Sequence, residues 1–228
     1  MKNIIILMVC VGSFLMGGCG KKEKNKSLAR TYYKLALSEL ADVPTDSGTP
    51  THAIKKSLQH VEQAITLDRN HEYCALKATL LFRLGKIRAS YQAFQALLAE
   101  KIDPVLKAEI INNYACVLAQ GKNYTKALVL WKQLAHDRYY LTPEVALANQ
   151  GRVYAMQHNF KRAKRCFSQA VTHAPHFLDA HYYLALMAYH LNEYGLVKNE
   201  ISTILFLEPE HGGAKALKTR LEKGKVMV

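Results

Sequence analysis

Two kinds of residue are scarce in this sequence: cysteines that could pair, and acidic side chains. Cys74, Cys116 and Cys166 lie far apart in the main part of the chain, and an odd number of isolated cysteines excludes a disulfide framework. The 18 Asp and Glu residues are outnumbered by 31 Lys and Arg residues, and the formal net charge is +13. This balance favours an acidic protein partner or an anionic membrane surface, unless the charge is simply spread over solvated faces.

The motifs of common enzyme chemistry are also missing. There is no glycine-rich phosphate loop, no nucleophile elbow and no nucleic-acid-binding motif. His173, His176 and His181 form the densest histidine group, but they surround an expected exposed turn and no cysteine accompanies them. We therefore expect a protein that is not an enzyme, with no metal, no cofactor, no small-molecule substrate and no nucleic-acid partner.

Residues 1–18 have the pattern of a secretory signal peptide. Lys2 supplies a positive charge, an apolar run covers residues 4–16, and two glycines follow. The run is shorter than the roughly 20 residues that a helix needs to cross a bilayer. It fits a signal peptide with a small-residue cleavage site. An uncleaved short anchor, or a signal cut elsewhere, is the alternative.

Cys19 directly follows the two glycines, and this arrangement resembles the lipobox of bacterial lipoproteins. In that family the cysteine becomes the new N-terminus and carries the lipid. The resemblance implies a protein that is lipidated at Cys19 and anchored to the membrane without spanning it. Gly20, in place of the Asp that retains such proteins at the inner membrane, implies an outer-membrane location facing the periplasm. The polar, lysine-rich residues 19–27 are expected to form a flexible tether.

Residues 147–175 predict two short amphipathic helices joined by a turn. Gly151, Ala163 and Ala170 stand where two helices must approach closely, and larger apolar residues fill the spaces between them. Pro175 ends the second helix. A hairpin of this kind buries its apolar face only by stacking on further hairpins.

The same pattern of small and large residues recurs 34 residues later in the chain. It also recurs 36 residues earlier and again a further 37 residues earlier, and a fainter first copy ends at Arg69. This spacing resembles the tetratricopeptide repeat (TPR), a helix–turn–helix unit of 34 residues. The resemblance implies an all-α TPR solenoid over residues 28–228, with about five repeats. A capping helix at residues 214–221 is expected to cover its last apolar face. An irregular helical bundle with the same apolar spacing is the alternative.

The first repeat is expected to be longer than the others. Its helices are predicted at residues 28–41 and 54–67, and residues 42–52 between them contain two prolines and several other turn formers. We expect a loop there.

In TPR proteins the first helix of each repeat lines a concave groove, and we expect a protein partner to bind there. Asparagine can bond an extended peptide backbone through both its donor and its acceptor. Arginine can hold a carboxylate by two hydrogen bonds, and tyrosine supplies rigid contact area. The register of repeats three to five selects the following candidates: Asn112, Asn113, Asn149, Arg152, Tyr182, Tyr183 and Tyr189. For Asn113 and Asn149 a scaffold role is the alternative.

The candidates match the carboxylate clamp of chaperone-binding TPR domains only in part. Cys116, Ala148 and Tyr182 stand where clamp residues would be expected. A binder of chaperone C-terminal peptides is therefore not expected.

A narrower resemblance is carried by residues 112–127, which read NNYACVLAQGKNYTKA. They are similar to a segment of the type IV pilus biogenesis lipoproteins called PilF or PilW. The next repeat follows residues 140–144 (YLTPE) and has Gly151 at its tight-packing position, again as in that family. The resemblance implies a pilotin, a lipoprotein that escorts the pilus secretin to the outer membrane and helps it form its ring.

Another class of envelope TPR lipoprotein fits the same features. It would be a subunit of the outer-membrane barrel assembly machinery or an adaptor for peptidoglycan enzymes. In both interpretations the protein binds another protein, and the membrane contact is made through the lipid anchor.

Overall fold

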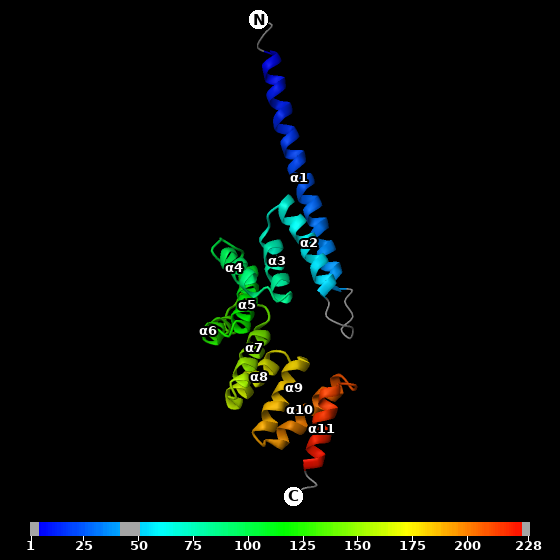
Figure 1. The fold of residues 1–228 in the computed structure, drawn as a ribbon, viewed down its shortest axis with the longest axis vertical. Helices are drawn as coiled ribbons and strands as arrows, with labels where there is room; N and C mark the ends of the chain where they lie inside the picture. Colours follow the sequence, from blue (N-terminus) through cyan, green and yellow to red (C-terminus); the bar gives the residue numbers. More distant parts are fainter. Residues whose placement is uncertain (1–4, 42–50, 225–228) are drawn as a thin grey trace. The chain divides into compact units, whose positions relative to one another are not determined.

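The computed structural model describes residues 5–41 and 51–224, and all regular structure within these ranges is helical. The chain divides into two compact units, Met1–Ile102 and Asp103–Val228, which are described one at a time (Figure 1). Consecutive helices inside each unit pack against one another as antiparallel hairpins.

The first unit contains two hairpins. Its helices are α1 (Ile5–Ala41), α2 (Thr51–Leu67), α3 (His71–Arg83) and α4 (Ile87–Leu98). The apolar stripes of α1, α2 and α3 meet in one core, whose fully buried members include Ala36, Val61 and Leu80. A buried serine on α2 adds a polar link, since the Ser57 hydroxyl donates to the Ala36 carbonyl at 2.7 Å. The predicted first hairpin is therefore present, with its second helix starting three residues earlier than expected.

Helix α1 is longer than the sequence pattern predicts. It runs without a break through residues 19–27, which we expected to form a flexible tether. Lysine and glutamate are good helix formers, so a helix that is nucleated by packing at Ala29 and Ala36 can continue into this polar stretch. The side chains of residues 21–24 are exposed, so the extension is helical without being packed.

Two predictions concern parts of the chain of which little is described. The predicted loop at residues 42–52 falls mostly on residues 42–50, which lie outside the described residues. The side chain of Cys19 also lies outside them, so the cleavage site and the lipidation of Cys19 stay predictions. Across the helices described, none combines the length and the apolar character needed to cross a membrane.

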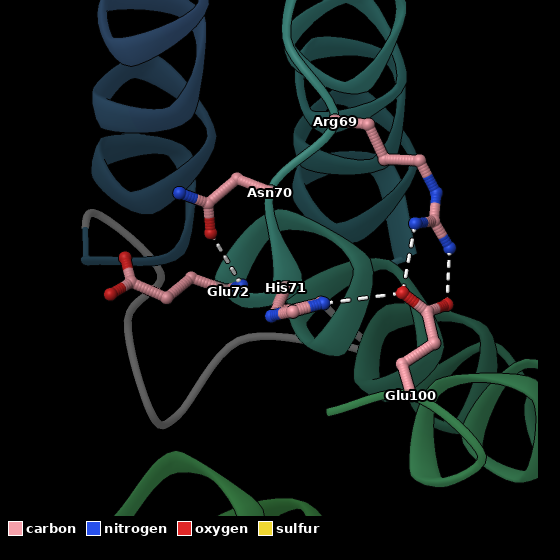
Figure 2. A network of polar contacts seen from close by, with 5 residues as sticks. All are labelled: Arg69, Asn70, His71, Glu72 and Glu100. Carbon is pink, nitrogen blue, oxygen red and sulfur yellow. Dashed lines mark hydrogen bonds and ion pairs between the residues drawn. The ribbon is translucent and has the colours of Figure 1, made fainter. Parts of the chain in front are cut away.

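A network of polar contacts ties the turn between α2 and α3 to the end of α4 (Figure 2). The Arg69 guanidinium donates two hydrogen bonds to the Glu100 carboxylate, one of them 2.9 Å long. A ring nitrogen of His71 lies 3.2 Å from the same carboxylate. Next to it, the Asn70 side chain caps α3 by accepting from the Glu72 backbone N–H at 2.8 Å. The bidentate pair with Arg69 is the main reason why the pKa of Glu100 falls from 4.5 to about 2.

This shift predicts a specific pH dependence for the substitution Glu100→Gln. The pKa of Glu100 is lowered in the folded state, so its contribution to stability is present above about pH 4.5 and is lost as the pH falls towards 2. The melting temperature of Glu100→Gln should therefore lie below that of the parent at pH 6, and the two should converge between pH 4.5 and pH 2. Thermal unfolding followed by circular dichroism measures this. Glu62→Gln is the matched control, because Glu62 makes a single contact with Lys77; an equal convergence there would contradict the assignment to Glu100.

The second unit contains three hairpins and a final helix. Its helices are α5 (Pro104–Gln120), α6 (Tyr124–Leu134), α7 (Pro143–Met156), α8 (Phe160–His173), α9 (Leu178–His190), α10 (Tyr194–Leu207) and α11 (Gly212–Gly224). Proline at the first position and an aspartate cap start α5, where the Asp103 carboxylate accepts from the Val105 and Leu106 backbone N–H groups.

The crossing of α7 and α8 depends on a glycine. Gly151 is buried, and a Cβ atom added to it would lie 2.8 Å from the ring of Phe167, which is itself fully buried. Ala163 and Ala170 are fully buried on the facing helix. The three small residues therefore stand at the close approach that their spacing predicts.

The turns inside the four hairpins from α3–α4 to α9–α10 share one backbone feature. Gly85, Lys122, His158 and Asn192 all have a positive φ, between 56° and 73°. Their separations are 37, 36 and 34 residues, the repeat spacing read from the sequence. The next residue donates its N–H back into the preceding helix each time, as Asn159 does to the Tyr154 carbonyl at 2.9 Å. This left-handed C-cap closes the helix, and among these four turns only the one between α3 and α4 uses glycine, the residue that suits the conformation best.

Helix α11 closes the second unit. Leu217 and Leu221 pack on Ala188, Val197 and Ile201 of α9 and α10. The predicted cap at residues 214–221 is thus present and extends over Gly212–Gly224. Five hairpins and a cap are the arrangement that the repeat pattern predicts.

Candidate partner-binding surface

The candidate residues lie on α5, α7 and α9, the first helices of the three hairpins in the second unit. Asn112 is not available to a partner. Its side chain is 8% exposed, and its amide oxygen accepts from Trp131 Nε1 at 3.0 Å and from Asn149 Nδ2 at 3.3 Å. Asn112 is a structural residue that satisfies the buried indole N–H and links α5 to α7. The next residue, Asn113, is half-buried.

Arg152 is the centre of a polar cluster on α7 and α9. Its guanidinium donates to the Asn149 amide oxygen at 3.2 Å and to the Asp179 carboxylate at 2.8 Å. It also lies over the Tyr183 ring, 5.2 Å from the centroid. These contacts hold the guanidinium in one place while leaving its side chain 38% exposed. We call Asn149, Arg152, Asp179 and Tyr183 the α7–α9 cluster.

The cluster changes what Arg152 can recognise. We expected Arg152 to hold a carboxylate of the partner, but Asp179 already supplies one, and its own side chain is 61% exposed. A second carboxylate would meet a guanidinium whose charge is partly balanced. The N–H groups of Arg152 and the exposed carboxylate of Asp179 together suit a segment that offers both acceptors and donors, as an extended peptide backbone does.

The three candidate tyrosines have different surroundings. Tyr183 stacks on Phe167, with ring centroids 5.3 Å apart and planes 14° apart. Tyr182 lies under the start of α11, where a Cβ atom at Gly213 would be 2.8 Å from its ring. Tyr189 meets Tyr194 edge-on, and the Arg220 guanidinium lies 5.6 Å from its ring centroid. Only Tyr183 therefore belongs to the α7–α9 cluster.

Asp179 is not among the candidates that the sequence selected. Aspartate is common near the start of a helix, where its negative charge interacts favourably with the helix dipole. An aspartate at such a position therefore does not by itself indicate a binding residue. The signal that would find it is the pairing with Arg152, which joins residues 27 positions apart.

The thiols of Cys116 and Cys166 are poor nucleophiles. Burial raises the pKa of Cys116 to about 11, and burial raises that of Cys166 to about 11 as well. Both are protonated at neutral pH, and a protonated thiol is a poor nucleophile. In the described part of the chain, no group of three or more His, Cys, Asp and Glu residues is placed to hold a metal ion.

The three histidines around the turn from α8 to α9 differ in how exposed they are. His173 and His176 are exposed, whereas His181 is buried. One ring nitrogen of His181 lies 2.6 Å from the Glu200 carboxylate and the other lies 2.9 Å from the Pro175 carbonyl. His181 therefore ties α9 to α10 and to the turn before α9, which is a structural role.

Residues 149–196 match the family model described as Tetratricopeptide repeat. This range covers most of α7, all of α8 and α9, and the start of α10, so the match falls on two successive hairpins. The chain has the TPR fold. Proteins with this fold are generally non-catalytic scaffolds that bind other proteins.

Solved structures of TPR proteins match nearly the whole chain. PilF of Pseudomonas aeruginosa is 17% identical and superposes with a TM-score of 0.70, covering 88% of this chain and 85% of its own. PilW, described as a widely conserved type IV pilus biogenesis factor, is 19% identical with a TM-score of 0.63, covering 86% of this chain and 92% of its own. YrrB, described as a TPR protein with an unusual peptide-binding site, is 15% identical with a TM-score of 0.54, covering 86% of this chain and 95% of its own. Identities this low show a common fold. A search among curated proteins found no match.

Proposed function

We propose that this chain is an outer-membrane lipoprotein that assists the assembly of a type IV pilus secretin. Its TPR scaffold binds a segment of the secretin, and the lipid on Cys19 holds the complex at the membrane. The observation that carries the proposal is the match in fold and length to PilF and PilW, two proteins of type IV pilus systems. The segment at residues 112–127 and the lipobox at Cys19 support it from the sequence.

The α7–α9 cluster is the part of the scaffold that we assign to the partner. Arg152 is oriented from two sides, by Asn149 and by Asp179, so little rotamer freedom remains to be lost on binding. The Tyr183 ring stacks on the Phe167 ring and also contacts the Arg152 guanidinium. Rigid tyrosine and arginine side chains dominate the energetics of many protein interfaces.

The chemistry of the cluster describes the segment that binds it. Asp179 provides an exposed acceptor and Arg152 provides exposed donors, so an extended strand or a helix end with unpaired backbone groups fits both. An acidic tail does not fit, because Asp179 would repel it. This distinguishes the proposed site from a carboxylate clamp.

The test is genetic and uses secretin multimers in the outer membrane as its measurement. Deletion of the gene should lower the amount of secretin multimers in the outer membrane, and the intact gene should restore that amount. Arg152→Ala with Tyr183→Ala should fail to restore them, and should weaken secretin binding by about tenfold or more, because each residue is worth about 2 kcal/mol at a typical hot spot. Cys19→Ala should also fail to restore them, and should abolish labelling with palmitate.

Lys126→Ala is the matched control, since Lys126 is exposed on α6 and outside the cluster. It should restore multimers as well as the parent does. Normal multimer levels after deletion of the gene would rule out the pilotin role. The scaffold would then belong to another envelope assembly, such as the barrel assembly machinery or a peptidoglycan-enzyme complex.

A further inference from the structure

A pocket of about 290 Å³ opens between α6, α7 and α8. We call it the outer pocket. It is lined by one stripe from each of three consecutive helices. The lining residues are Lys132, Ala135 and His136 from α6 and its end, Leu147, Gln150 and Tyr154 from α7, and Arg162, Arg165, Cys166 and Gln169 from α8.

The charge of the outer pocket has one sign. Lys132, Arg162 and Arg165 contribute three positive charges to its lining, at exposed positions, and none of its lining residues is acidic. Within residues 5–41 and 51–224, none of the three is ion-paired with a carboxylate, although ten other ion pairs are present there. Three cations gathered without a counter-charge repel one another, so this arrangement favours an anion between them.

An amide adds a hydrogen-bond donor to this lining. Gln150 lines the outer pocket, although the residue is only 7% exposed. Among the described residues no buried side-chain nitrogen or oxygen lacks a hydrogen-bond partner, so Gln150 contributes as a donor of the lining and not as an unsatisfied buried group. The Arg162 guanidinium is positioned nearby, 5.7 Å from the centroid of the Tyr154 ring.

From these observations we propose that the outer pocket binds a phosphate group. Two guanidiniums, one ammonium and one amide offer more donors than the two oxygens of a carboxylate can accept, whereas a phosphate presents three or four oxygens. Arginine matches phosphate by paired hydrogen bonds. Leu147, Ala135 and the Tyr154 ring form an apolar wall for the carbon chain that carries the phosphate. The pocket is small, at the lower limit for small-molecule sites, so it suits a head group or a small phosphate ester.

This inference concerns a different face from the α7–α9 cluster, and it does not depend on the proposed secretin partner. The phosphate can come from a phospholipid head group or from a soluble phosphate ester. The two sources share the chemistry of the pocket, and the experiment separates them.

The experiment uses the full chain in a neutral detergent. Thermal unfolding is compared in roughly 50 mM phosphate or glycerol 3-phosphate and in chloride at the same ionic strength, because a ligand that binds the folded state raises the melting temperature. The parent should be stabilised by the phosphate compounds. Arg162→Gln with Arg165→Gln should weaken the affinity by about tenfold or more, since hydrogen bonds to charged groups are lost. Gln150→Glu should abolish the effect by placing a negative charge in the pocket.

The matched control is Lys126→Gln with Lys161→Gln. It also removes two positive charges, one from α6 and one from α8, at exposed positions that do not line the pocket, and should respond to phosphate as the parent does. Circular dichroism checks that all variants are folded.

A second arm identifies the source of the phosphate. Amide hydrogen exchange of residues 160–169 is measured for the full chain on vesicles of phosphatidylcholine alone and on vesicles that also contain phosphatidylglycerol. Slower exchange with phosphatidylglycerol, lost in the double arginine variant, assigns a lipid head group. Stabilisation by glycerol 3-phosphate without this slowing assigns a soluble ester. Any of three results would overturn the proposal. They are the absence of both effects, an equal response of the double arginine variant and the parent, and stronger binding of hexaglutamate than of phosphate.

Discussion

Replacement of Gly151 by leucine is expected to destabilise the protein by about 1–3 kcal/mol or more, the usual cost of overpacking a tight core. A single Cβ atom at this position would already lie 2.8 Å from the Phe167 ring. Phe167 is fully buried, packed with Ala148, Ala163 and Leu184, and stacked on Tyr183. It has no space into which to move, so α7 and α8 must separate.

Urea unfolding followed by circular dichroism measures this effect. Gly151→Ala should be destabilised less than Gly151→Leu but still clearly, because its one added atom meets the same ring. Lys161→Ala, an exposed change on α8, should stay within about 0.5 kcal/mol of the parent. Equal losses for Gly151→Leu and Lys161→Ala would contradict the packing described for α7 and α8.

The second large effect is expected at Asn112. Asn112→Leu removes the acceptor of the Trp131 indole N–H, and Trp131 is 2% exposed, so water cannot replace it. An unsatisfied buried donor costs about 1–3 kcal/mol. The Asn149 amide loses one of its two acceptors in the same variant and keeps only the weak contact with the Cys116 sulfur, which also loosens the support of Arg152.

A double-mutant cycle identifies the hydrogen bond as the cause. Trp131→Phe removes the donor, so Asn112→Leu should cost less in a Trp131→Phe background than in the parent. Unfolding is followed by circular dichroism at 222 nm and not by tryptophan fluorescence, because Trp131→Phe removes the sole tryptophan. Additive losses for the two single changes would show that the bond between them contributes nothing.

Adjacent asparagines show how far the sequence can predict the candidate surface. Asn112 and Asn113 both stand at the start of the NNY segment, and an α-helix places neighbours about 100° apart. The repeat register assigned both to the groove. In the structure Asn112 turns inward to Trp131 while Asn113 stays half-buried at the surface. The choice depends on the position of an indole nineteen residues away, which no local pattern specifies.

The tyrosines show a similar limit. Tyr182 and Tyr183 are both tyrosines and were both predicted to face the groove. Their surroundings differ because the start of α11 packs over Tyr182. Gly213 allows this close approach, and its role is visible only when α11 is packed on α9. The outer pocket is a further example, since its charge comes from two stripes, on α6 and α8, that are separate in the sequence.

The sequence by itself determined the number of hairpins, the small residues at the helix crossing and the cap, and it placed the first hairpin's turn and second helix to within a few residues but not the start of α1. These features are local or periodic, so the apolar spacing and the position of Gly151 or Pro175 carry them directly. The tertiary structure alone decided which polar residues are satisfied internally and which remain available to a ligand. That distinction depends on contacts between helices, as between Arg152 and Asp179 or around Gln150, and a pattern read along one helix contains no information about the side chains that face it from the next.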